Sequence, residues 1–240
     1  MSASALRSRG PAPSNVDVAV DALRAAILDG QLEPGVRLKE IPLAEQLGIS
    51  RGPIREALRL LERDGLIELI PNRGAIVPAV NALDVLETYA LRASLGSLAL
   101  QKLMLEDRVP EAALERELRA LRASVADLDT RRAGDADLGY QSAIIAASGL
   151  PRVTREFERL TWQVRVFLTA LEIGYEDRLP RILEEVEALH AAIARREARE
   201  AEALWRVKYE RWVRDLVALL PEAFDEALWT ALTSGRTSPM

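Results

Sequence analysis

The sequence predicts a mainly α-helical protein, with an N-terminal winged helix-turn-helix domain followed by a C-terminal all-α helical bundle. Three observations lead to this prediction. Apolar residues recur at helical spacing along most of the 240 residues. A tight turn joins two short helical patterns near residue 49, and the strand-like patterns form a single hairpin before residue 78. Two domains are therefore expected.

The first domain is expected to span residues 15–79, behind a mobile polar arm at residues 1–14. The arm either has no role or lets Arg7 and Arg9 contact phosphates. Asn15 is expected to cap the first helix. Glycines and a Pro-Gly turn delimit three helices, at 16–29, 41–47 and 51–64.

A β-hairpin is expected directly after the third helix. Residues 66–70 and 75–77 are two short apolar runs, and the turn Pro71-Asn72-Arg73-Gly74 separates them. Helices with a tight turn between the last two, followed by a hairpin, have the layout of a winged helix-turn-helix.

The second domain is expected over residues 80–221, with a tail at 222–240 that carries a short helix near residues 224–232. Trp205 lies in an apolar helical stripe and is expected to pack in the core or at a dimer contact. Prolines and polar breaks delimit six helices of one bundle, at 82–104, 110–129, 135–148, 151–173, 179–196 and 198–219.

Composition excludes several classes of protein. The chain has no cysteine and a single histidine, so disulfides, a thiol nucleophile, a multi-histidine metal site and a Ser-His-Asp hydrolase are not expected. It has no apolar run of about 18 residues and no secretory signal. We therefore expect a cytoplasmic protein that is not an enzyme and has no membrane partner. The net charge of −5 comes from residues after 79, because residues 1–79 hold equal numbers of basic and acidic side chains.

Arginines follow one side of the third predicted helix. Arg51 and Arg55 are spaced i, i+4 at its start, after the capping residue Ser50, and Arg59 continues the row. Free N–H groups at a helix N-terminus favour phosphate, and arginine can read guanine through two parallel hydrogen bonds. The pattern predicts a DNA-contacting helix. The alternative is a solvated face whose arginines pair with Glu56 and other glutamates nearby.

The hairpin turn is a second basic element. Gly74 permits a positive φ and a close backbone approach, and Arg73, beside Asn72, is placed to enter a minor groove or to hold a phosphate. The alternative is a plain hairpin turn with an exposed arginine.

The N-terminal pattern resembles a known family. The matching residues are Leu47-Gly48-Ile49-Ser50-Arg51, Pro53, Arg55-Glu56-Ala57-Leu58, Gly65-Leu66 and Arg73-Gly74-Ala75. On these residues the stretch 16–78 resembles the DNA-binding domain of the GntR family of bacterial transcription regulators. The resemblance implies that Arg51 and Arg55 read bases, and that Ser50 and the region of Gly74 contact the DNA backbone. Gly52 stands where the family usually has threonine, so one phosphate contact is expected to be missing.

The remaining chain, over about residues 82–220, resembles the ligand-sensing helical domain of the FadR subgroup, called FCD. The matching residues are Leu91-Arg92, Asp137 with Tyr140, Ala146 with Ser148-Gly149, and Ala192-Ile193. This resemblance implies a homodimer on a near-palindromic double-stranded DNA operator. It also implies that a small metabolite, often a carboxylate, binds inside the bundle.

The metal ligands that this resemblance implies are mostly replaced. Many such domains hold a divalent metal with one Asp and three His. Asp137 stands at the first position, but the other three fall on Gln141, Val186 and Lys208. An amide and an ammonium do not replace imidazoles for a transition metal. No metal and no other cofactor is therefore expected. Gly96 stands where the family often has glutamate.

Charged side chains are candidates to take over the role of the metal. In this hypothesis Lys208 occupies the place of the metal, near Asp137, and holds an anionic effector. Arg92 is a second anchor, and Tyr140 and Gln141 donate hydrogen bonds. The alternative is that Arg92 and Lys208 pair with buried acids such as Asp137 and only hold the bundle together.

The sequence thus predicts a ligand-responsive, sequence-specific DNA-binding transcription regulator, acting as a homodimeric repressor that a small carboxylate metabolite releases. In one alternative, the helical domain is only a dimerisation or adaptor module with a degenerate effector pocket. In another, an enzyme carries an accessory DNA-binding module, although the bundle offers no Gly-rich phosphate loop and no nucleophile–histidine pair. A small molecule that changes the affinity for DNA would distinguish the ligand-responsive regulator from the protein with only a dimerisation or adaptor module.

Overall fold

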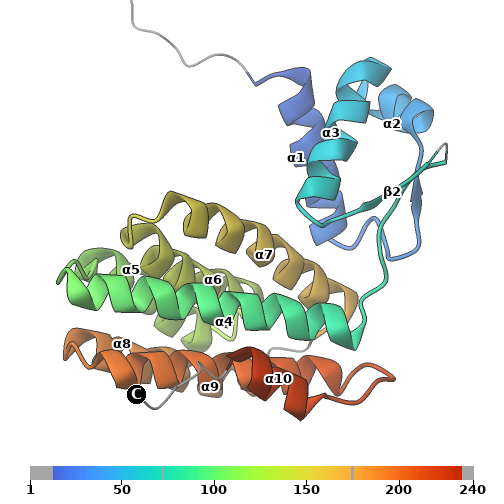
Figure 1. The fold of residues 1–240 in the computed structure, drawn as a ribbon. Coiled ribbons are helices and arrows are strands. Elements are labelled where there is room, and N and C mark those ends of the chain that lie inside the picture. The colour runs from blue at the N-terminus through green and yellow to red at the C-terminus, as the bar shows by residue number, and fades with distance from the viewer. Residues whose placement is uncertain (1–12, 72, 174–175, 234–240) are drawn as a thin grey trace, which may run out of the picture. The chain divides into compact units, whose positions relative to one another are not determined.

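The computed structural model describes residues 13–71, 73–173 and 176–233 (Figure 1). The chain divides into two compact units, one ending at Ala79 and the other beginning at Val80. No helix within the described ranges is long and apolar enough to cross a membrane.

The first unit is three helices with a small antiparallel sheet. Its elements are α1 (Asn15–Leu28), β1 (Arg37–Leu38), α2 (Glu40–Leu47), α3 (Arg51–Arg63), β2 (Glu68–Ile70) and β3 (Gly74–Ile76). The strand order is β1-β3-β2, with β3 in the middle. Ile54, Leu58 and Leu61 lie on the buried face of α3, as their spacing predicts, and leave its arginines on the outer face.

Three local details differ from the sequence-based expectation. Ser14, and not Asn15, caps α1, because Ser14 and Asp17 form a reciprocal capping box. The hairpin strand β2 begins at Glu68 and not at residue 66. The unpredicted strand β1 pairs with β3 and turns the hairpin into a three-stranded sheet.

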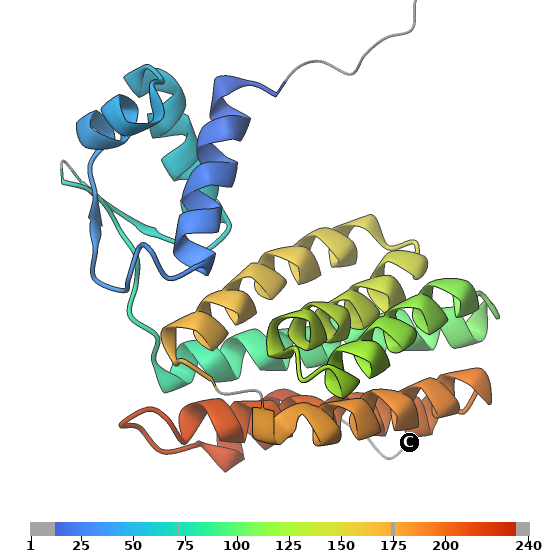
Figure 2. The ribbon, with the colours of Figure 1, turned by 180° about the vertical axis from the view of Figure 1, so that it is seen from behind.

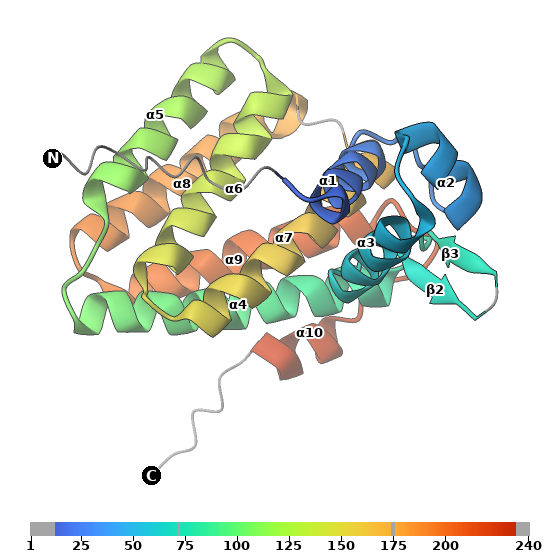
Figure 3. The same ribbon diagram turned by 90° about the horizontal axis from the view of Figure 1, so that it is seen from above.

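The second unit is a helical bundle (Figures 1 and 2). Its helices are α4 (Ala82–Leu105), α5 (Glu111–Ala126), α6 (Thr130–Ala147), α7 (Pro151–Ala170), α8 (Leu179–Ala194), α9 (Ala198–Val217) and α10 (Glu226–Thr233), with a short 3₁₀ turn, η1 (Glu176–Arg178). The long helix α4 packs against α6, α7 and α9, while α5 packs against α6 and α8. Figure 3 shows the bundle from a second direction. The winged helix-turn-helix and the all-helical bundle expected from the sequence are both present.

Two helices end earlier than predicted. α5 ends at Ala126 and α7 at Ala170, about three residues short of the expected ends. The chain leaves them through Leu128 and Glu172, which have φ values of 53° and 46°. A left-handed residue at the end of a helix is usually glycine, so leucine and glutamate at these positions gave no sequence signal that the helices end there. In the tail, α10 packs against α4 and buries Trp229.

The interior of the bundle is tightly filled where α4 faces α9. Trp205 is fully buried, 5.0 Å from Tyr209 and 6.2 Å from Phe157 between ring centroids. A Cβ atom at Gly96 would lie 2.1 Å from the indole of Trp205. The absence of a side chain at Gly96 therefore makes room for the tryptophan.

Candidate nucleic-acid interface and effector site

The recognition arginines lie on the outer face of α3. The side chains of Arg51 and Arg55 are 59% and 52% exposed, although both form ion pairs. A groove of about 1020 Å³ runs between α2, α3 and the hairpin, and both arginines line it together with Arg59, Arg73 and Gly74. The start of α3 and the hairpin turn thus share one concave basic surface.

A glutamate from α2 holds both recognition arginines. Glu40 accepts hydrogen bonds from Nε and Nη2 of Arg55 at 2.9 and 2.8 Å, and from Nη2 of Arg51 at 3.3 Å. The hydrogen bond from Arg55 is the main reason that the pKa of Glu40 falls from 4.5 to about 2. The same contact raises the pKa of Arg55. The carboxylate is therefore charged at any pH near neutrality.

The other candidates at the start of α3 are accessible. Ser50 is the residue before the helix, but its side chain makes no capping hydrogen bond. Gly52 is exposed, and a Cβ built there would meet no other atom within 4 Å. The space that the expected threonine side chain would take is therefore open. Arg59 pairs with Glu56 at 3.6 Å on the exposed face of the helix. Arg59 therefore has the environment of the alternative interpretation, in which the arginines of this helix pair with nearby glutamates on a solvated face.

The hairpin turn is shaped by the sheet as well as by any DNA contact. Gly74 has a φ of 88°, and a Cβ on it would lie 2.4 Å from the carbonyl oxygen of Leu38 in β1. The glycine is therefore required by the fold itself. Arg73 is exposed, and its backbone N–H closes the turn onto the carbonyl of Ile70 at 2.9 Å. Asn72 lies outside the described residues.

Four of the five candidate effector residues meet inside the bundle. Arg92 from α4 and Asp137 and Gln141 from α6 are buried, as is Lys208 from α9. Gln141 links them, because its Oε1 accepts from Arg92 Nη2 at 2.6 Å and its Nε2 donates to Asp137 Oδ2 at 3.1 Å. Tyr209 also donates to Gln141 Oε1, at 2.7 Å. Burial raises the pKa of Tyr209, so it stays a neutral donor.

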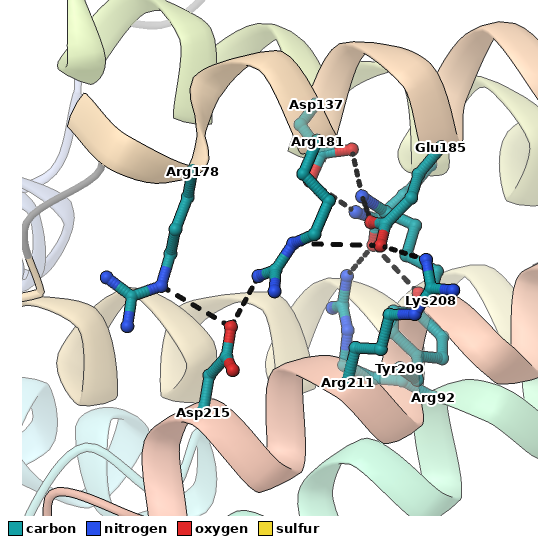
Figure 4. A network of polar contacts seen from close by, with 10 residues as sticks. Arg92, Asp137, Arg178, Arg181, Glu185, Lys208, Tyr209, Arg211 and Asp215 are labelled. Carbon is teal, nitrogen blue, oxygen red and sulfur yellow. Dashed lines mark hydrogen bonds and ion pairs between the residues drawn. The ribbon is translucent and has the colours of Figure 1, made fainter.

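Lys208 lies between two carboxylates (Figure 4). Its Nζ is 3.1 Å from Asp137 Oδ1 and 3.6 Å from Glu185 Oε2 of α8. The side chain of Glu185 is 8% exposed and also pairs with Arg211 at 3.0 Å, while Arg211 is half exposed. The sequence-based alternative, in which Lys208 pairs with a buried acid and only holds the bundle together, predicts this contact with Asp137.

Arg92 has a different environment from Lys208. Its guanidinium donates to the hydroxyl of Thr161 at 2.5 Å and to the Gln141 amide, both of which are neutral. It also lies 4.0 Å from the ring centroid of Phe157. No carboxylate among the described residues is within ion-pair distance of it, and its Nε has no acceptor. A fully buried cation without a counter-charge is costly.

The site does not fit a transition metal. Of the four implied positions only Asp137 offers an anionic ligand, and its Oδ1 faces the ammonium of Lys208, which has no lone pair to donate. Gln141 is engaged by Arg92, Tyr209 and Asp137. Across the described ranges no group of three or more His, Cys, Asp and Glu could hold a metal ion.

The space left at the centre of this cluster is small. A cavity of about 10 Å³ remains between α4, α6, α7 and α9, beside Arg92, Asp137 and Gln141. That volume is room for about one water molecule. Any larger molecule has to displace side chains before it can bind there.

Tyr140, the fifth candidate, lies apart from this cluster. Its hydroxyl is 3.1 Å from Nδ1 of His190 on α8. Nε2 of His190 is in turn 3.7 Å from Glu115 of α5. Burial, together with the nearby charge of Glu115, raises the pKa of Tyr140. His190 is partly buried, and it borders a separate shallow pocket of about 460 Å³ between α5 and α8.

Sequence reasoning missed several residues of these two sites. Glu40 precedes the arginines it binds by 11 and 15 residues, so no helical spacing connects them. The position singled out on α8 was Val186, which is buried, whereas the carboxylate near Lys208 belongs to its neighbour Glu185. One residue along a helix is a rotation of about 100°, so a small offset in alignment changes which side chain faces the site. Nothing in the sequence around Thr161 and Tyr209, apart from their positions in helices, indicated that they contact Arg92 and Gln141.

Comparison with protein-family models gives two matches that together span most of the chain. Residues 15–77 match the model described as "Bacterial regulatory proteins, gntR family". Residues 87–211, more than half of the chain, match the FCD domain.

Individual relatives and solved structures agree with these matches. The chain is 30% identical to the gluconate operon transcriptional repressor of Bacillus subtilis over 193 residues, 76% of each protein. It is 40% identical over 97 residues to the uncharacterized HTH-type transcriptional regulator YdhC of the same organism, an alignment that covers 40% of this chain and only 43% of YdhC. The solved structure of McbR/YncC from E. coli matches with a TM-score of 0.72 and 25% identity, over 86% of this chain and 99% of that one.

Proposed function

The chain belongs to the GntR family of bacterial regulatory proteins, and we propose that it is a transcription regulator that binds a specific double-stranded DNA operator. The observation that carries this proposal is the pair of exposed arginines at the start of α3, which share a groove with Arg73 of the hairpin. An arginine on a recognition helix can bond to guanine bidentately. Arginine at the hairpin supplies a contact to phosphate or to the minor groove.

Replacing Arg55 with alanine tests the proposed role in base reading. The variant should lose discrimination between the operator and random DNA by about 1–3 kcal/mol, while its affinity for random DNA changes much less. An operator for this measurement can be selected from a random duplex library with the wild-type protein. Equal losses on operator and random DNA would show that Arg55 only neutralises phosphate.

We further propose that the regulator is a homodimer paired through α4. The exposed face of this helix carries Leu91, Leu98 and Leu105 at seven-residue spacing, the repeat of a helix–helix seam. If two copies of α4 run antiparallel with Leu91 opposite Leu98, Glu87 of one copy comes opposite Lys102 of the other, so the charges are complementary. A dimer of this kind suits a near-palindromic operator.

Charge placed on this face tests the dimer. Leu91→Glu with Leu98→Glu should halve the mass found by sedimentation equilibrium and weaken binding to a two-half-site operator. Leu219, equally exposed but on the turn after α9, serves as the control position for a Leu→Glu change. A dimer that survives the double substitution would place the contact on another face.

For the effector, we propose a small carboxylate that pairs with Arg92. The supporting observation is that Arg92 is a fully buried cation whose hydrogen-bond acceptors are neutral, while the nearby carboxylates are paired with Lys208 and Arg211. A carboxylate would replace the Gln141 oxygen as acceptor and give a stronger, charge-assisted hydrogen bond. The relative named as the gluconate operon transcriptional repressor supports repression as the mode. No metal is proposed to take part.

Thermal denaturation of chelator-treated protein with a panel of small carboxylates and sugar acids tests the effector. A ligand at 100 times its Kd stabilises the native state by about 2.7 kcal/mol, which corresponds to an increase in Tm of about 5–11 °C for a domain of this size. Arg92→Met should abolish that response. A carboxylate that stabilises this variant as much as the wild type binds somewhere else.

A second candidate function is a DNA-binding dimer whose bundle responds to no ligand. The cavity of about 10 Å³ favours it. DNA affinity that stays constant across the whole panel, together with an unchanged Tm, would support this function and contradict the effector proposal.

A further inference from the structure

The contact between Glu40 and the two recognition arginines joins two helices of the helix-turn-helix. Glu40 is the first residue of α2, and Arg51 and Arg55 occupy the first two turns of α3. The Glu40 side chain is only 24% exposed, whereas the two arginines are more than half exposed. The anionic side chain is therefore less accessible than the two cations, with which it lines one groove.

The geometry of the fork matters for what Arg55 can still do. Glu40 takes the N–H of Nε and one N–H of Nη2 of Arg55. A guanidinium has five N–H groups, so both hydrogens of Nη1 and the second hydrogen of Nη2 are left. One N–H of Nη1 and the remaining N–H of Nη2 form the parallel pair at the end of the side chain, and two parallel N–H groups are what bidentate recognition of guanine needs. Arg55 can thus bond to a base and to Glu40 at the same time.

Arg51 is held through one nitrogen alone, at 3.3 Å. The carboxylate of Glu40 therefore fixes Arg55 firmly and restrains Arg51 more loosely. A phosphate that is to bind either arginine with the same nitrogens has to displace Glu40, whose negative charge also lowers the local positive potential. Contact with phosphate, which every DNA sequence offers, is weakened, while the base-reading end of Arg55 stays in place.

We propose that Glu40 is a positioning residue for sequence discrimination, which aims Arg55 at a base and keeps Arg51 and Arg55 from binding the phosphates of random DNA. This inference rests on the proposed DNA-binding function. It predicts that loss of the Glu40 charge raises affinity for random DNA and lowers preference for the operator. The low pKa of Glu40, about 2, means that the restraint persists across the pH range of DNA-binding measurements.

The test compares Glu40→Gln with Glu56→Gln in the full-length chain. Both changes remove one negative charge from the helix-turn-helix, but within the described part of the chain the ion pair of Glu56 is with Arg59, at 3.6 Å. Affinities are measured for an operator selected in vitro with the wild type and for a random duplex of equal length, over a series of salt concentrations. Far-UV circular dichroism melts check that the variants fold.

We expect Glu40→Gln to lower the ratio of operator to random-DNA affinity at least tenfold. On random DNA its plot of log affinity against log salt should steepen by about 0.9 for each arginine released to a phosphate. Glu56→Gln should change the ratio less than threefold. In a background of Arg55→Ala, Glu40→Gln should lower the ratio much less than in the wild type, because only Arg51 is then left for Glu40 to restrain.

Equal changes in the two glutamine variants would overturn the proposal, since charge alone would then explain them. An unchanged ratio in Glu40→Gln would overturn it as well. Failure of the proposed function has a different signature: the wild type itself would select no operator. In that case the salt dependence on random DNA still decides whether Glu40 restrains the arginines.

Discussion

Replacing Lys208 with methionine is expected to destabilise the helical bundle by about 3–5 kcal/mol, the cost of removing one partner of a buried ion pair. Lys208 is 2% exposed, and methionine would keep most of its apolar stem while removing the ammonium. Glu185 would retain Arg211, 3.0 Å away. Asp137 would keep only its hydrogen bond from Gln141. Asp137 is thus the one carboxylate left without a cation, so the free-energy cost of an unpaired buried charge applies once and not twice.

Urea denaturation followed by far-UV circular dichroism measures this cost, and Tm should fall by about 6–20 °C. Arg119→Met is the control, because Arg119 pairs with Glu115 one turn along the surface of α5, at 3.8 Å, and should contribute at most about 0.5 kcal/mol. Adding Asp137→Asn to Lys208→Met should recover part of the loss, since it removes the unpaired charge. A Lys208→Met variant within 1 kcal/mol of the control would refute the reasoning that the ammonium neutralises the cluster.

Three further predictions concern the interior and the arginine fork. Gly96→Ala should cost at least about 1–3 kcal/mol in urea denaturation, because its Cβ would lie 2.1 Å from the buried indole of Trp205; a loss below 0.5 kcal/mol would mean that the indole can shift by about 0.9 Å, from 2.1 to 3.0 Å, at little cost. Gln141→His combined with Lys208→His should create a zinc-dependent rise in Tm after chelator treatment, and an equal rise in the wild type would contradict the absence of a metal site. The free energy of unfolding of Glu40→Gln should approach that of the wild type as the pH falls from 4.5 towards 2, because a carboxyl with a depressed pKa stabilises the native state above its unfolded pKa and loses that effect on protonation.

Local sequence patterns predicted most of the fold, because helix periodicity and helix-ending glycines and prolines act within a few residues of one another. The errors come from interactions that local pattern does not contain. Strand β1 has two residues and exists only because β3 pairs with it. Ser14 and Asn15 are both good caps, and Asp17 decides between them, because its carboxylate accepts a hydrogen bond from the backbone N–H of Ser14.

The candidate sites could be predicted in part for a similar reason. Spacing within α6 places Asp137 and Gln141 on one face, and a cation from α9 meets them there. Tyr140, one residue before Gln141, points to a different neighbour, because adjacent helical residues are about 100° apart. Glu185 is one of several glutamates on a charged helix, and only the tertiary structure shows that it is the buried one.

The departures from the family pattern in the bundle are physically coupled. A glutamate at position 96 could not coexist with Trp205 in its present place, since a Cβ alone would lie 2.1 Å from the indole. Trp205 in turn packs against Tyr209 and Phe157, the two rings that flank the guanidinium of Arg92. With an apolar wall on these sides, the hydrogen-bonding capacity of Arg92 is directed at Gln141 and Thr161.

A histidine in place of Gln141 would remove the amide oxygen that Arg92 and Tyr209 now share. The glycine, the glutamine and the lysine therefore form one rebuilt interior, in which Lys208 balances Asp137 and Glu185 and Arg92 is held by neutral groups. It follows that a carboxylate entering this interior has one favourable place to bind, the guanidinium of Arg92. Its affinity will be set by the cost of breaking the Arg92–Gln141 hydrogen bond and of opening the packed rings, more than by the charge attraction itself.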